Sequence, residues 1–575
     1  MSGYMREYER WLTSPCLTDE ERAAVAAVTD AEERELAFGR TLEFGTAGLR
    51  SSMAMGPGRM NVHTVAWATR GLAELVLRAG GAERGVAIAY DSRHNSALFS
   101  RVAAEVLAAA GIRVYLFDDL RPTPELSFAV RHLGCQAGIN VTASHNPREY
   151  NGYKAYWEDG AQLSPEDAAV VSRAMAEIDV LGGAERMPYE RALAEGRITL
   201  LGEEFDEEYL AALDKTVIDR EVLSRASESL SVVYTPLHGA GRRLVPEVLR
   251  RAGLCHIATV EEQMIPDGDF PTVCKPNPEY AEVFRLGTAL AERVGSDIVI
   301  ATDPDSDRVG VVTRTASGGF ETISGNKMGA LLLDYIIGAR RRTGTLPEGA
   351  FTIKSIVSTD LVTKIAATNG IVLHDVLTGF KYIGEVIGGY EARGEVNKFI
   401  FGFEESYGYL TGSYARDKDA VGTSLMIAEM TAYYEERGMT LADALDELDR
   451  KYGIYREKTT EIYMEGLDGL ARQARVMEAL RQDPPRMLGG LRVTSIGDYS
   501  KGYFTNVDTG ERTAIPQPPS NVLYFVTETD DKVVIRPSGT EPKIKLYFLV
   551  HGESEAEAEG KIARFAEDTA AFSEA

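Results

Sequence analysis

Cysteine is scarce in this chain: only four of its 575 residues are cysteines, at positions 16, 135, 255 and 274. They are widely spaced, and no two of them form a C-x-x-C pair. This spacing argues against a zinc knuckle and against a disulfide framework. We expect all four to be buried thiols.

Long apolar runs are missing as well. No stretch of the sequence approaches the roughly eighteen apolar residues that a membrane-spanning helix needs. The N-terminal segment, residues 1–11, is charged and lacks the apolar core of a signal peptide. We therefore expect no membrane insertion and no export, and we predict a cytoplasmic protein.

Positive charge is in deficit, because 62 lysines and arginines face 87 acidic residues and leave a net charge of −25. Such a surplus of negative charge repels nucleic acids and anionic membranes, so we expect neither as a partner. Hydrophobic residues make up 44% of the chain, which argues against extensive disorder. The length exceeds what one hydrophobic core supports, so several domains are expected.

Strand-like runs alternate with helical runs along most of the chain. One such unit runs from the apolar segment 86–90 through a helical stretch at 97–110 to a second apolar segment at 114–117. This alternation predicts parallel sheets covered by helices. After about residue 453 the pattern becomes strand-rich, and the sequence S-E-A-E at 554–557 predicts a capping box that opens a final helix.

A serine hydroxyl is predicted at the end of a buried strand. Residues 142–147 read T-A-S-H-N-P and follow the apolar run 138–141, which places Ser144 on a turn. A G-x-S-x-G elbow is missing, so acyl hydrolysis is not indicated. Taken alone, the segment is equally typical of an ordinary Asn-Pro turn.

Three carboxylates crowd one predicted strand-to-strand turn. Residues 303–308 read D-P-D-S-D-R, and apolar runs flank them on both sides. Because like charges repel, a cation is expected among Asp303, Asp305 and Asp307, and hard oxygen ligands suit Mg²⁺. An EF-hand is excluded, since its sixth and twelfth positions would be Arg308 and Arg314. The alternative is a solvated acidic turn.

Two further turns carry groups that suit a phosphorylated sugar. Residues 536–542 read R-P-S-G-T-E-P, which supplies an arginine, two hydroxyls and a glycine, the components of a phosphate cradle. Residues 402–408 read G-F-E-E-S-Y-G, and we expect Glu404 and Ser406 on one side of an extended segment, where they match vicinal sugar hydroxyls. Ordinary turns are the alternative for both segments.

In this order along the chain, the four segments resemble the phosphoserine, metal, sugar-recognition and phosphate-binding loops of the α-D-phosphohexomutase superfamily, the phosphoglucomutases and phosphomannomutases. Smaller stretches agree: F-G-T-A-G-L-R at 44–50, A-Y-D-S-R at 89–93, Y-T-P-L-H-G at 234–239 and L-T-G-F-K-Y at 377–382. The last two are most similar to the bacterial α-phosphoglucomutases of the phosphoglucomutase-2/phosphopentomutase-like branch.

The resemblance implies an α/β fold of four domains around a central cleft. Three α/β domains with mixed, mostly parallel sheets and helices on both faces would precede a C-terminal α+β domain. We expect a phosphoserine-bearing domain at 1–205, a metal-binding domain at 206–322, a sugar-recognition domain at 323–453 and a phosphate-binding domain at 454–575. The charged stretch 182–214 would join the first two. A monomer or homodimer is expected.

Chemistry explains why such an enzyme would carry a phosphoryl group itself. The C1 and C6 oxygens of one hexose are too far apart to share an in-line transition state. By resemblance, Ser144 carries the phosphate and exchanges it with a small-molecule sugar phosphate through glucose 1,6-bisphosphate, which also acts as activator. Mg²⁺ would bind Asp303, Asp305, Asp307 and a phosphoserine oxygen at Ser144.

The resemblance assigns the remaining roles. Beside Ser144, the residues expected in catalysis are Arg50, His145, Lys154, Arg308 and Lys418. The residues expected to bind substrate are Thr46, Gly379, Lys381, Glu404, Ser406, Arg416, Arg536, Ser538, Gly539 and Thr540.

The general acid/base has two candidates. Lys418 lies in R-D-K-D-A at 416–420, which matches the R-x-K-D-G segment of the glucose-specific branch except at its last residue. Lys154, in N-G-Y-K at 151–154, is the alternative. A histidine after the sugar-loop serine, found in another branch, is replaced here by Tyr407.

Substrate preference is open at this level. The E-E-S form of the sugar loop favours interconversion of α-D-glucose 1-phosphate and glucose 6-phosphate. Phosphopentomutase activity on ribose or deoxyribose phosphates and phosphomannomutase activity are alternatives. A phosphosugar-binding or bisphosphate-synthesising protein without mutase turnover is a further one.

Overall fold

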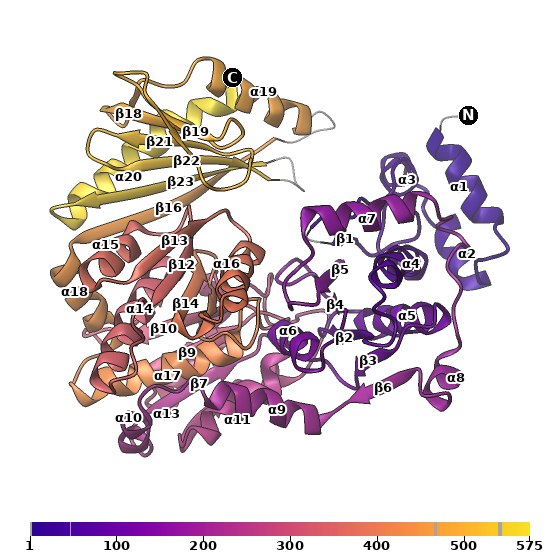
Figure 1. Ribbon diagram of the computed structural model, residues 1–575, viewed down its shortest axis with the longest axis horizontal. Coiled ribbons are helices and arrows are strands. Elements are labelled where there is room, and N and C mark those ends of the chain that lie inside the picture. The colour runs from indigo at the N-terminus through magenta and orange to yellow at the C-terminus, as the bar shows by residue number, and fades with distance from the viewer. Residues whose placement is uncertain (1–2, 47, 465–468, 539–542, 575) are drawn as a thin grey trace.

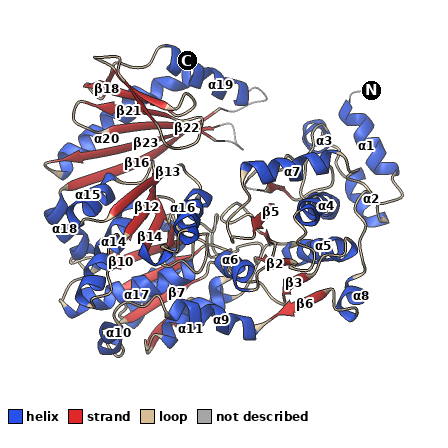
Figure 2. Cartoon of the chain, viewed as in Figure 1, coloured by secondary structure: helices blue, strands red, loops and turns tan. Residues whose placement is uncertain are grey.

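The computed structural model describes residues 3–46, 48–464, 469–538 and 543–574. Four sheets follow one another along the chain, and Figure 1 shows the first at the right, near the N-terminus, and the last at the upper left. Helices flank the first three sheets, whereas the last sheet is the most strand-rich part (Figure 2). The predicted fold class, three α/β domains and a C-terminal α+β domain, is confirmed.

The first sheet is mixed. Its order is β1 (Leu49–Ser52), β5 (Tyr150–Trp157), β4 (Ala137–Val141), β2 (Val86–Tyr90), β3 (Val114–Phe117) and β6 (Ile198–Leu201). Strands β4, β2, β3 and β6 run parallel, β5 pairs antiparallel with β4, and β1 pairs antiparallel with β5. The surrounding helices are α4 (Val62–Arg78), α5 (Ser96–Ala109), α6 (Thr123–His132), α7 (Pro165–Ala176) and α8 (Tyr189–Ala194), after an N-terminal group of α1 (Gly3–Thr13), α2 (Asp19–Ala26) and α3 (Ala31–Phe38).

Alternating residues of β2 show that both faces of this sheet are covered. Val86 and Ile88 belong to the core cluster formed with α4 and α5. Ala87 and Ala89 belong to the cluster formed with α6. Because successive side chains of a strand point to opposite faces, α6 lies on one side of the sheet and α4 and α5 on the other.

The second and third sheets repeat this design. The second has the order β11 (Phe320–Ile323), β10 (Val309–Arg314), β9 (Ile298–Thr302), β7 (Ser231–Thr235) and β8 (His256–Thr259), with α9 (Glu203–Asp214), α10 (Arg220–Ala226), α11 (Gly241–Arg251), α12 (Glu261–Met264) and α13 (Arg285–Val294). The third has the order β13 (Val372–Val376), β12 (Phe351–Ser355), β14 (Phe399–Glu404) and β15 (Gly408–Leu410), with α14 (Gly325–Arg342), α15 (Asp360–Asn369), α16 (Phe380–Ala392), α17 (Ala420–Glu436) and α18 (Leu441–Tyr452). In each sheet three neighbouring strands run parallel, β8, β7 and β9 in the second and β13, β12 and β14 in the third, and antiparallel pairing extends the sheet on one side.

The fourth sheet is antiparallel throughout its described pairs. Its order is β16 (Ile454–Tyr463), β23 (Lys543–Gly552), β22 (Lys532–Pro537), β21 (Leu523–Thr527), β18 (Leu491–Asp498), β19 (Tyr503–Asn506) and β20 (Arg512–Ala514), with β17 (Met487–Leu488) beside β18. Val533 packs with α19 (Gly469–Gln482) and α20 (Glu555–Ala570) on one face. Val534 packs on the other face with Ile356 and Val357, which follow β12. This second face docks the last sheet onto the third.

Several local expectations require correction. The stretch 182–214, which we expected to join the first two domains, contains β6, which pairs parallel with β3, so part of it belongs to the first sheet. At the start of α20, Ser554 accepts the Glu557 N–H, but the Glu557 carboxylate accepts the Glu553 N–H instead of closing a capping box. The expectation of buried thiols was wrong for three cysteines: only the one at position 135 is buried. Across the described ranges, none of the helices has both the length and the apolar character that crossing a membrane requires.

Candidate active site

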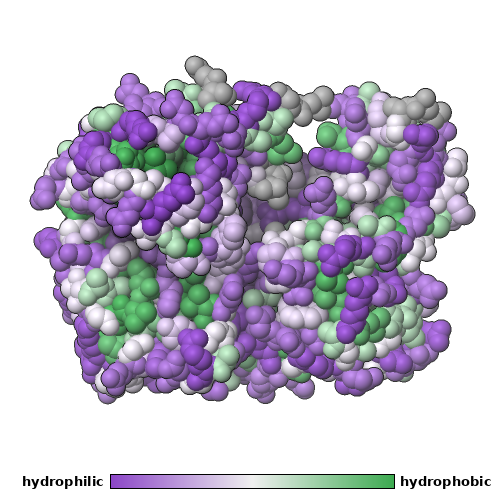
Figure 3. Space-filling view, turned by 45° about the horizontal axis from the view of Figure 1, so that its top comes forward, coloured by the Kyte–Doolittle hydropathy of each residue, from purple (hydrophilic) through white to green (hydrophobic). Residues whose placement is uncertain are grey.

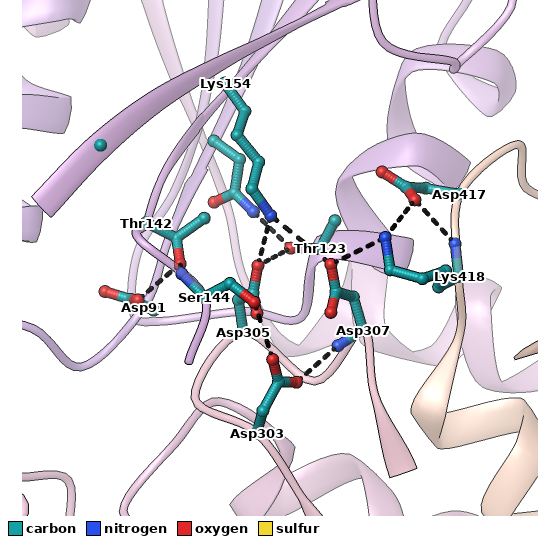
Figure 4. A network of polar contacts seen from close by, with 12 residues as sticks. Asp91, Thr123, Thr142, Ser144, Lys154, Asp303, Asp305, Asp307, Asp417 and Lys418 are labelled. Atoms are coloured by element: carbon teal, nitrogen blue, oxygen red, sulfur yellow. Dashed lines mark hydrogen bonds and ion pairs between the residues drawn. The ribbon is translucent and has the colours of Figure 1, made fainter. Parts of the chain in front are cut away.

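The proposed nucleophile occupies a tight turn at the end of β4. Ser144 has a φ of 53°, in the left-handed region, and it is only 4% exposed. Its N–H donates to Thr142 Oγ1 at 2.8 Å, and its hydroxyl donates to Asp303 Oδ2 at 2.9 Å (Figure 4). His145 Nδ1 lies 3.1 Å from the same hydroxyl oxygen. The turn therefore presents Ser144 Oγ directly to the aspartate cluster.

The aspartate cluster lies on the turn between β9 and β10, as the sequence predicted. Asp303, Asp305 and Asp307 are all buried, and one ligand oxygen from each lies within 4.8 Å of the others. Asp303 Oδ1 accepts the N–H groups of Asp307 at 3.1 Å and Arg308 at 3.0 Å, which fixes its orientation. The turn needs a left-handed residue, and Ser306 supplies it with a φ of 54°.

These residues fit a divalent cation. Asp305 Oδ1 and Asp307 Oδ1 are buried and have no hydrogen-bond partner among the residues that the structure describes. Burial, and next the charges of Asp305 and Asp307, raise the pKa of Asp303 well above its usual value. A bound cation would relieve this repulsion and satisfy the unpartnered oxygens. Oxygen-only ligands are the set that Mg²⁺ prefers.

Two lysines reach the cluster from other parts of the chain. Lys154, on β5, lies 2.8 Å from Asp305 Oδ2 and 3.5 Å from Asp307 Oδ2. Lys418 lies 3.2 Å from Asp307 Oδ2 and 3.2 Å from Asp417 Oδ1 (Figure 4). Burial opposes the charged form of Lys418, but Asp307 and Asp417 outweigh it and raise its pKa above the usual value. Both candidate acid/base residues are thus brought to the site.

Thr123 is a site residue that the sequence reasoning missed. Its hydroxyl donates to Asp305 Oδ2 at 2.8 Å, and its N–H donates to the Asp305 carbonyl at 2.8 Å. Asn140 Nδ2 in turn donates to Thr123 Oγ1 at 2.6 Å. The Thr-Pro pair could have indicated the start of α6, but no sequence signal indicates which carboxylate that helix start meets.

Asp417 was also missed. It accepts the Tyr156 hydroxyl at 2.9 Å and holds Lys418 through both the backbone N–H and the ammonium group. Because Tyr156 lies on β5 of the first sheet, this contact fixes the Lys418 loop against the part of the chain that carries Ser144.

Two arginines and a histidine surround the serine turn. Arg50, on β1, donates to the Asn146 side chain at 3.1 Å. Arg308 Nη1 lies 2.5 Å from Glu279 Oε1. Burial, followed by the charges of Arg308 and Arg50, lowers the pKa of His145 well below its usual value. His145 is therefore neutral at pH 7.

The sugar-recognition segment differs in one respect from the expectation. Glu404 ends β14 and accepts the Gly379 N–H at 2.6 Å, where Gly379 has a φ of 125°. Ser406 lies in the turn that follows, and Tyr407 has a φ of 65°. The expected extended segment from Glu404 to Ser406 was wrong, because the chain reverses to form β15. Lys381, at the start of α16, is half-buried, and burial lowers its pKa.

The remaining predicted residues lie in three places. Thr46 is half-buried beside the Gly45–Gly48 bridge, and Arg536 and Ser538 lie at the end of β22. Gly539 and Thr540 lie outside the described residues. Arg416 is fully buried and donates to the Ser413 and Ala415 carbonyls and to Glu391, so the structure does not bring it to the aspartate cluster. On the face shown in Figure 3, a hollow opens between the N-terminal part of the molecule and the rest, and below it the two parts are in contact.

Family models match four successive parts of the chain. They are described as phosphoglucomutase/phosphomannomutase alpha/beta/alpha domains I, II and III, at residues 41–181, 207–318 and 324–452, and the C-terminal domain, at residues 511–568. Together they span well over half of the sequence.

Known proteins show the same similarity. A phosphoglucomutase of Staphylococcus epidermidis (strain ATCC 12228 / FDA PCI 1200) is 39% identical over 521 residues, which cover 90% of this chain and 92% of that protein. A phosphoglucomutase of Staphylococcus aureus (strain MRSA252) is 37% identical over 526 residues, covering 90% and 91%.

Solved structures share the fold. The open form of pp63/parafusin, a phosphoglucomutase from Paramecium, is 16% identical with a TM-score of 0.69, covering 93% of this chain and 96% of that one. A phosphoglucomutase/phosphomannomutase family protein from Burkholderia thailandensis is 19% identical with a TM-score of 0.64, covering 92% and 97%.

Proposed function

This chain belongs to the phosphoglucomutase/phosphomannomutase family, and from that premise we propose that it interconverts α-D-glucose 1-phosphate and glucose 6-phosphate through a phosphoserine at Ser144 and a glucose 1,6-bisphosphate intermediate. The observation that carries the proposal is the contact of Ser144 Oγ with Asp303, 2.9 Å away in a buried group of three carboxylates. A hydroxyl held beside a metal-binding group is suited to accept and return a phosphoryl group.

Asp303, Asp305 and Asp307, together with an oxygen at Ser144, would hold Mg²⁺. The ion would offset the negative charge that develops on the phosphoryl oxygens during transfer. The chain's own residues add to this effect, because Arg50 and Arg308 flank the serine turn and place positive charge beside it.

Lys418 is our candidate for the group that relays the proton. Its ammonium group would donate a proton to the leaving oxygen, and the amine so formed would take the proton of the attacking sugar hydroxyl. Lys418 lies within 3.2 Å of Asp307 and projects toward the cluster that faces Ser144 (Figure 4). Lys154, which is closer to Asp305, would mainly hold that carboxylate in place. A neutral His145 beside Ser144 Oγ would orient the hydroxyl.

We assign substrate recognition to the third and fourth domains. Glu404 and Ser406 would bind sugar hydroxyls, and we also assign Gly379, Lys381 and, from the first domain, Thr46 to substrate binding. The phosphate that does not react in a given half-cycle would bind Arg536, Ser538, Gly539 and Thr540. We retain the proposed domain limits 1–205, 206–322, 323–453 and 454–575. Arg416 would link the third domain to the first, because its backbone N–H donates to Ser127 Oγ. We further propose a cytoplasmic monomer or homodimer whose partners are small sugar phosphates.

The first test is a coupled assay for glucose 6-phosphate formation from glucose 1-phosphate with Mg²⁺. It should be run with and without a trace of glucose 1,6-bisphosphate. Matched assays should follow the isomerisation of ribose 1-phosphate to ribose 5-phosphate and of mannose 1-phosphate to mannose 6-phosphate. We expect bisphosphate-primed turnover that EDTA abolishes and Mg²⁺ restores. Faster turnover of the pentose or mannose phosphate would overturn the proposed substrate, and no turnover of any of them would overturn mutase activity.

A further inference from the structure

An arginine that has no part in the proposed chemistry lies beneath the serine turn. Arg93, which follows β2, is 3% exposed. Its guanidinium donates to the carbonyls of Ser144 at 2.6 Å, Pro147 at 2.9 Å and Tyr150 at 3.1 Å, and also to that of Asn146. One side chain thus holds four backbone oxygens of the turn that presents the nucleophile.

Asp91 fixes this arginine to the same strand end. Its carboxylate lies 3.2 Å from Arg93 Nε and accepts the Arg93 N–H at 3.0 Å. It also accepts the Thr142 hydroxyl at 2.6 Å, and Thr142 in turn accepts the Ser144 N–H. Asp91 and Arg93 therefore determine the backbone path on both sides of Ser144.

A residue of the second domain covers the guanidinium. The ring centroid of Phe270 lies 5.1 Å from Arg93 Cζ, within the range of a cation–π contact, and the ring is 2% exposed. Two residues earlier, a Cβ on Gly268 would lie 2.5 Å from the backbone nitrogen of His94. Only glycine at position 268 lets the loop 265–273 approach the loop after β2 this closely, because a side chain there would clash with the backbone of His94.

The same loop is anchored to the metal turn. His238 Nδ1 lies 2.8 Å from the Ile265 carbonyl, and its Nε2 lies 2.9 Å from Thr272 Oγ1, so one ring braces both ends of the loop. The turn that carries His238 packs on the aspartate segment: the Ala240 N–H donates to the Pro304 carbonyl at 2.8 Å. A Cβ on Gly239 would lie 2.4 Å from Pro304 Cα.

We propose that the loop 265–273 is a positioning element that sets the serine turn at a fixed place relative to the aspartate turn. Phe270 is the positioning residue on the serine side, through Arg93, and His238 is its counterpart on the aspartate side. The inference rests on the proposed function, because it assigns the loop to phosphoryl transfer at Ser144. Transfer requires the nucleophile and the metal ligands to be aligned to a fraction of an ångström, and they come from different domains.

The ion pair between this loop and the loop after β2 contributes little to this role. His94 Nε2 lies 3.1 Å from Asp269 Oδ1, but both side chains are more than half exposed. An exposed ion pair of this kind contributes little to rigidity. The buried ring of Phe270 is therefore the informative position to change.

The test compares Phe270→Leu with Phe284→Leu, a matched change at a buried phenylalanine of the same domain that packs in its core. Measured quantities are kcat and KM for glucose 1-phosphate, the rate at which glucose 1,6-bisphosphate phosphorylates Ser144, and the thermal midpoint. We expect Phe270→Leu to lower kcat and the phosphorylation rate by about tenfold or more with KM changed less than about twofold. Phe284→Leu should lower the midpoint and leave kcat at the wild-type value.

A double-mutant cycle with Arg93→Lys adds a second measurement. If Phe270 acts through Arg93, adding Phe270→Leu to Arg93→Lys should lower kcat no further. Additive effects, an unchanged kcat in Phe270→Leu, or equal losses of kcat in Phe270→Leu and Phe284→Leu would each overturn the positioning role. A wild-type protein that turns over no sugar phosphate would instead overturn the proposed function, so the two failures are distinguishable.

Discussion

Ser144 Oγ donates a hydrogen bond to Asp303 Oδ2 at 2.9 Å, although 159 positions separate the two residues in the chain. This contact joins the ends of β4 and β9, which belong to different sheets. If Ser144 carries the transferred phosphoryl group, Ser144→Ala should lower kcat by at least about 10³-fold, because the nucleophile is lost. Intact-mass spectrometry after incubation with glucose 1,6-bisphosphate should show phosphate on the wild type and none on the variant. An active Ser144→Ala variant would contradict the mechanism.

The hydrogen bond from Thr123 to Asp305 leads to a prediction about metal binding. The Thr123 hydroxyl orients Asp305 from the first domain, and residues that orient a metal ligand typically contribute about 10- to 100-fold in metal affinity or activity. Thr123→Val should therefore raise the Mg²⁺ concentration at half-maximal activity by about that factor. Thr123→Ser keeps the hydroxyl and is the matched control. Equal Mg²⁺ dependence in Thr123→Val and Thr123→Ser would show that the hydroxyl does not position the ligand.

The sequence predicted best those features that depend on residues close together in the chain. The three aspartates could be grouped because positions i, i+2 and i+4 of one tight turn are close whatever surrounds them. The strands at 86–90 and 114–117 agree with the structure to the residue, since their apolar runs are bounded by clear breaks. The grouping of the four loops came from family resemblance and could not have come from spacing.

Contacts between domains were not predictable in this way. No periodicity connects Thr123 with Asp305, or Phe270 with Arg93, because each pair forms only when two folded units dock. The extended path expected between Glu404 and Ser406 failed for a local reason: Tyr407 adopts a left-handed conformation that alternation of residue types does not reveal. The exposed cysteines show that residue type alone is a weak guide to burial.

The position of Lys418 beside Asp307 leads to a prediction about proton transfer. The Lys418 ammonium group lies between Asp307 and Asp417, and a general acid/base contributes about 10²- to 10⁴-fold to kcat. Lys418→Met should therefore lower kcat by about that factor, measured in the glucose 1-phosphate assay. Lys451→Met is a suitable control, since Lys451 pairs with Asp334 at the surface and should leave kcat unchanged. If instead Lys154→Met lowers kcat and Lys418→Met does not, the acid/base role belongs to Lys154.

We expect the stability of the folded protein to depend on pH through Glu457, which lies at the junction of the third and fourth domains. It lies on β16, where burial raises its pKa from 4.5 to about 7, while a hydrogen bond with Thr359 and the charge of Arg456 act in the opposite direction. The folded protein therefore binds this proton more tightly than the unfolded chain does. The resulting stabilisation is fully present below about pH 4.5 and is lost as the pH rises through about 7.

Replacement by glutamine removes this titration and keeps the size of the side chain. The thermal midpoint of the wild type relative to Glu457→Gln should therefore fall by a few degrees between pH 5 and pH 8, an interval that contains the raised pKa of about 7 of Glu457 in the folded protein. Comparing the difference between the two proteins cancels the titration of all other groups. A difference in midpoint that stays constant over this interval would mean that Glu457 is ionised in the folded protein throughout, with Arg456 and Thr359 together outweighing the effect of burial.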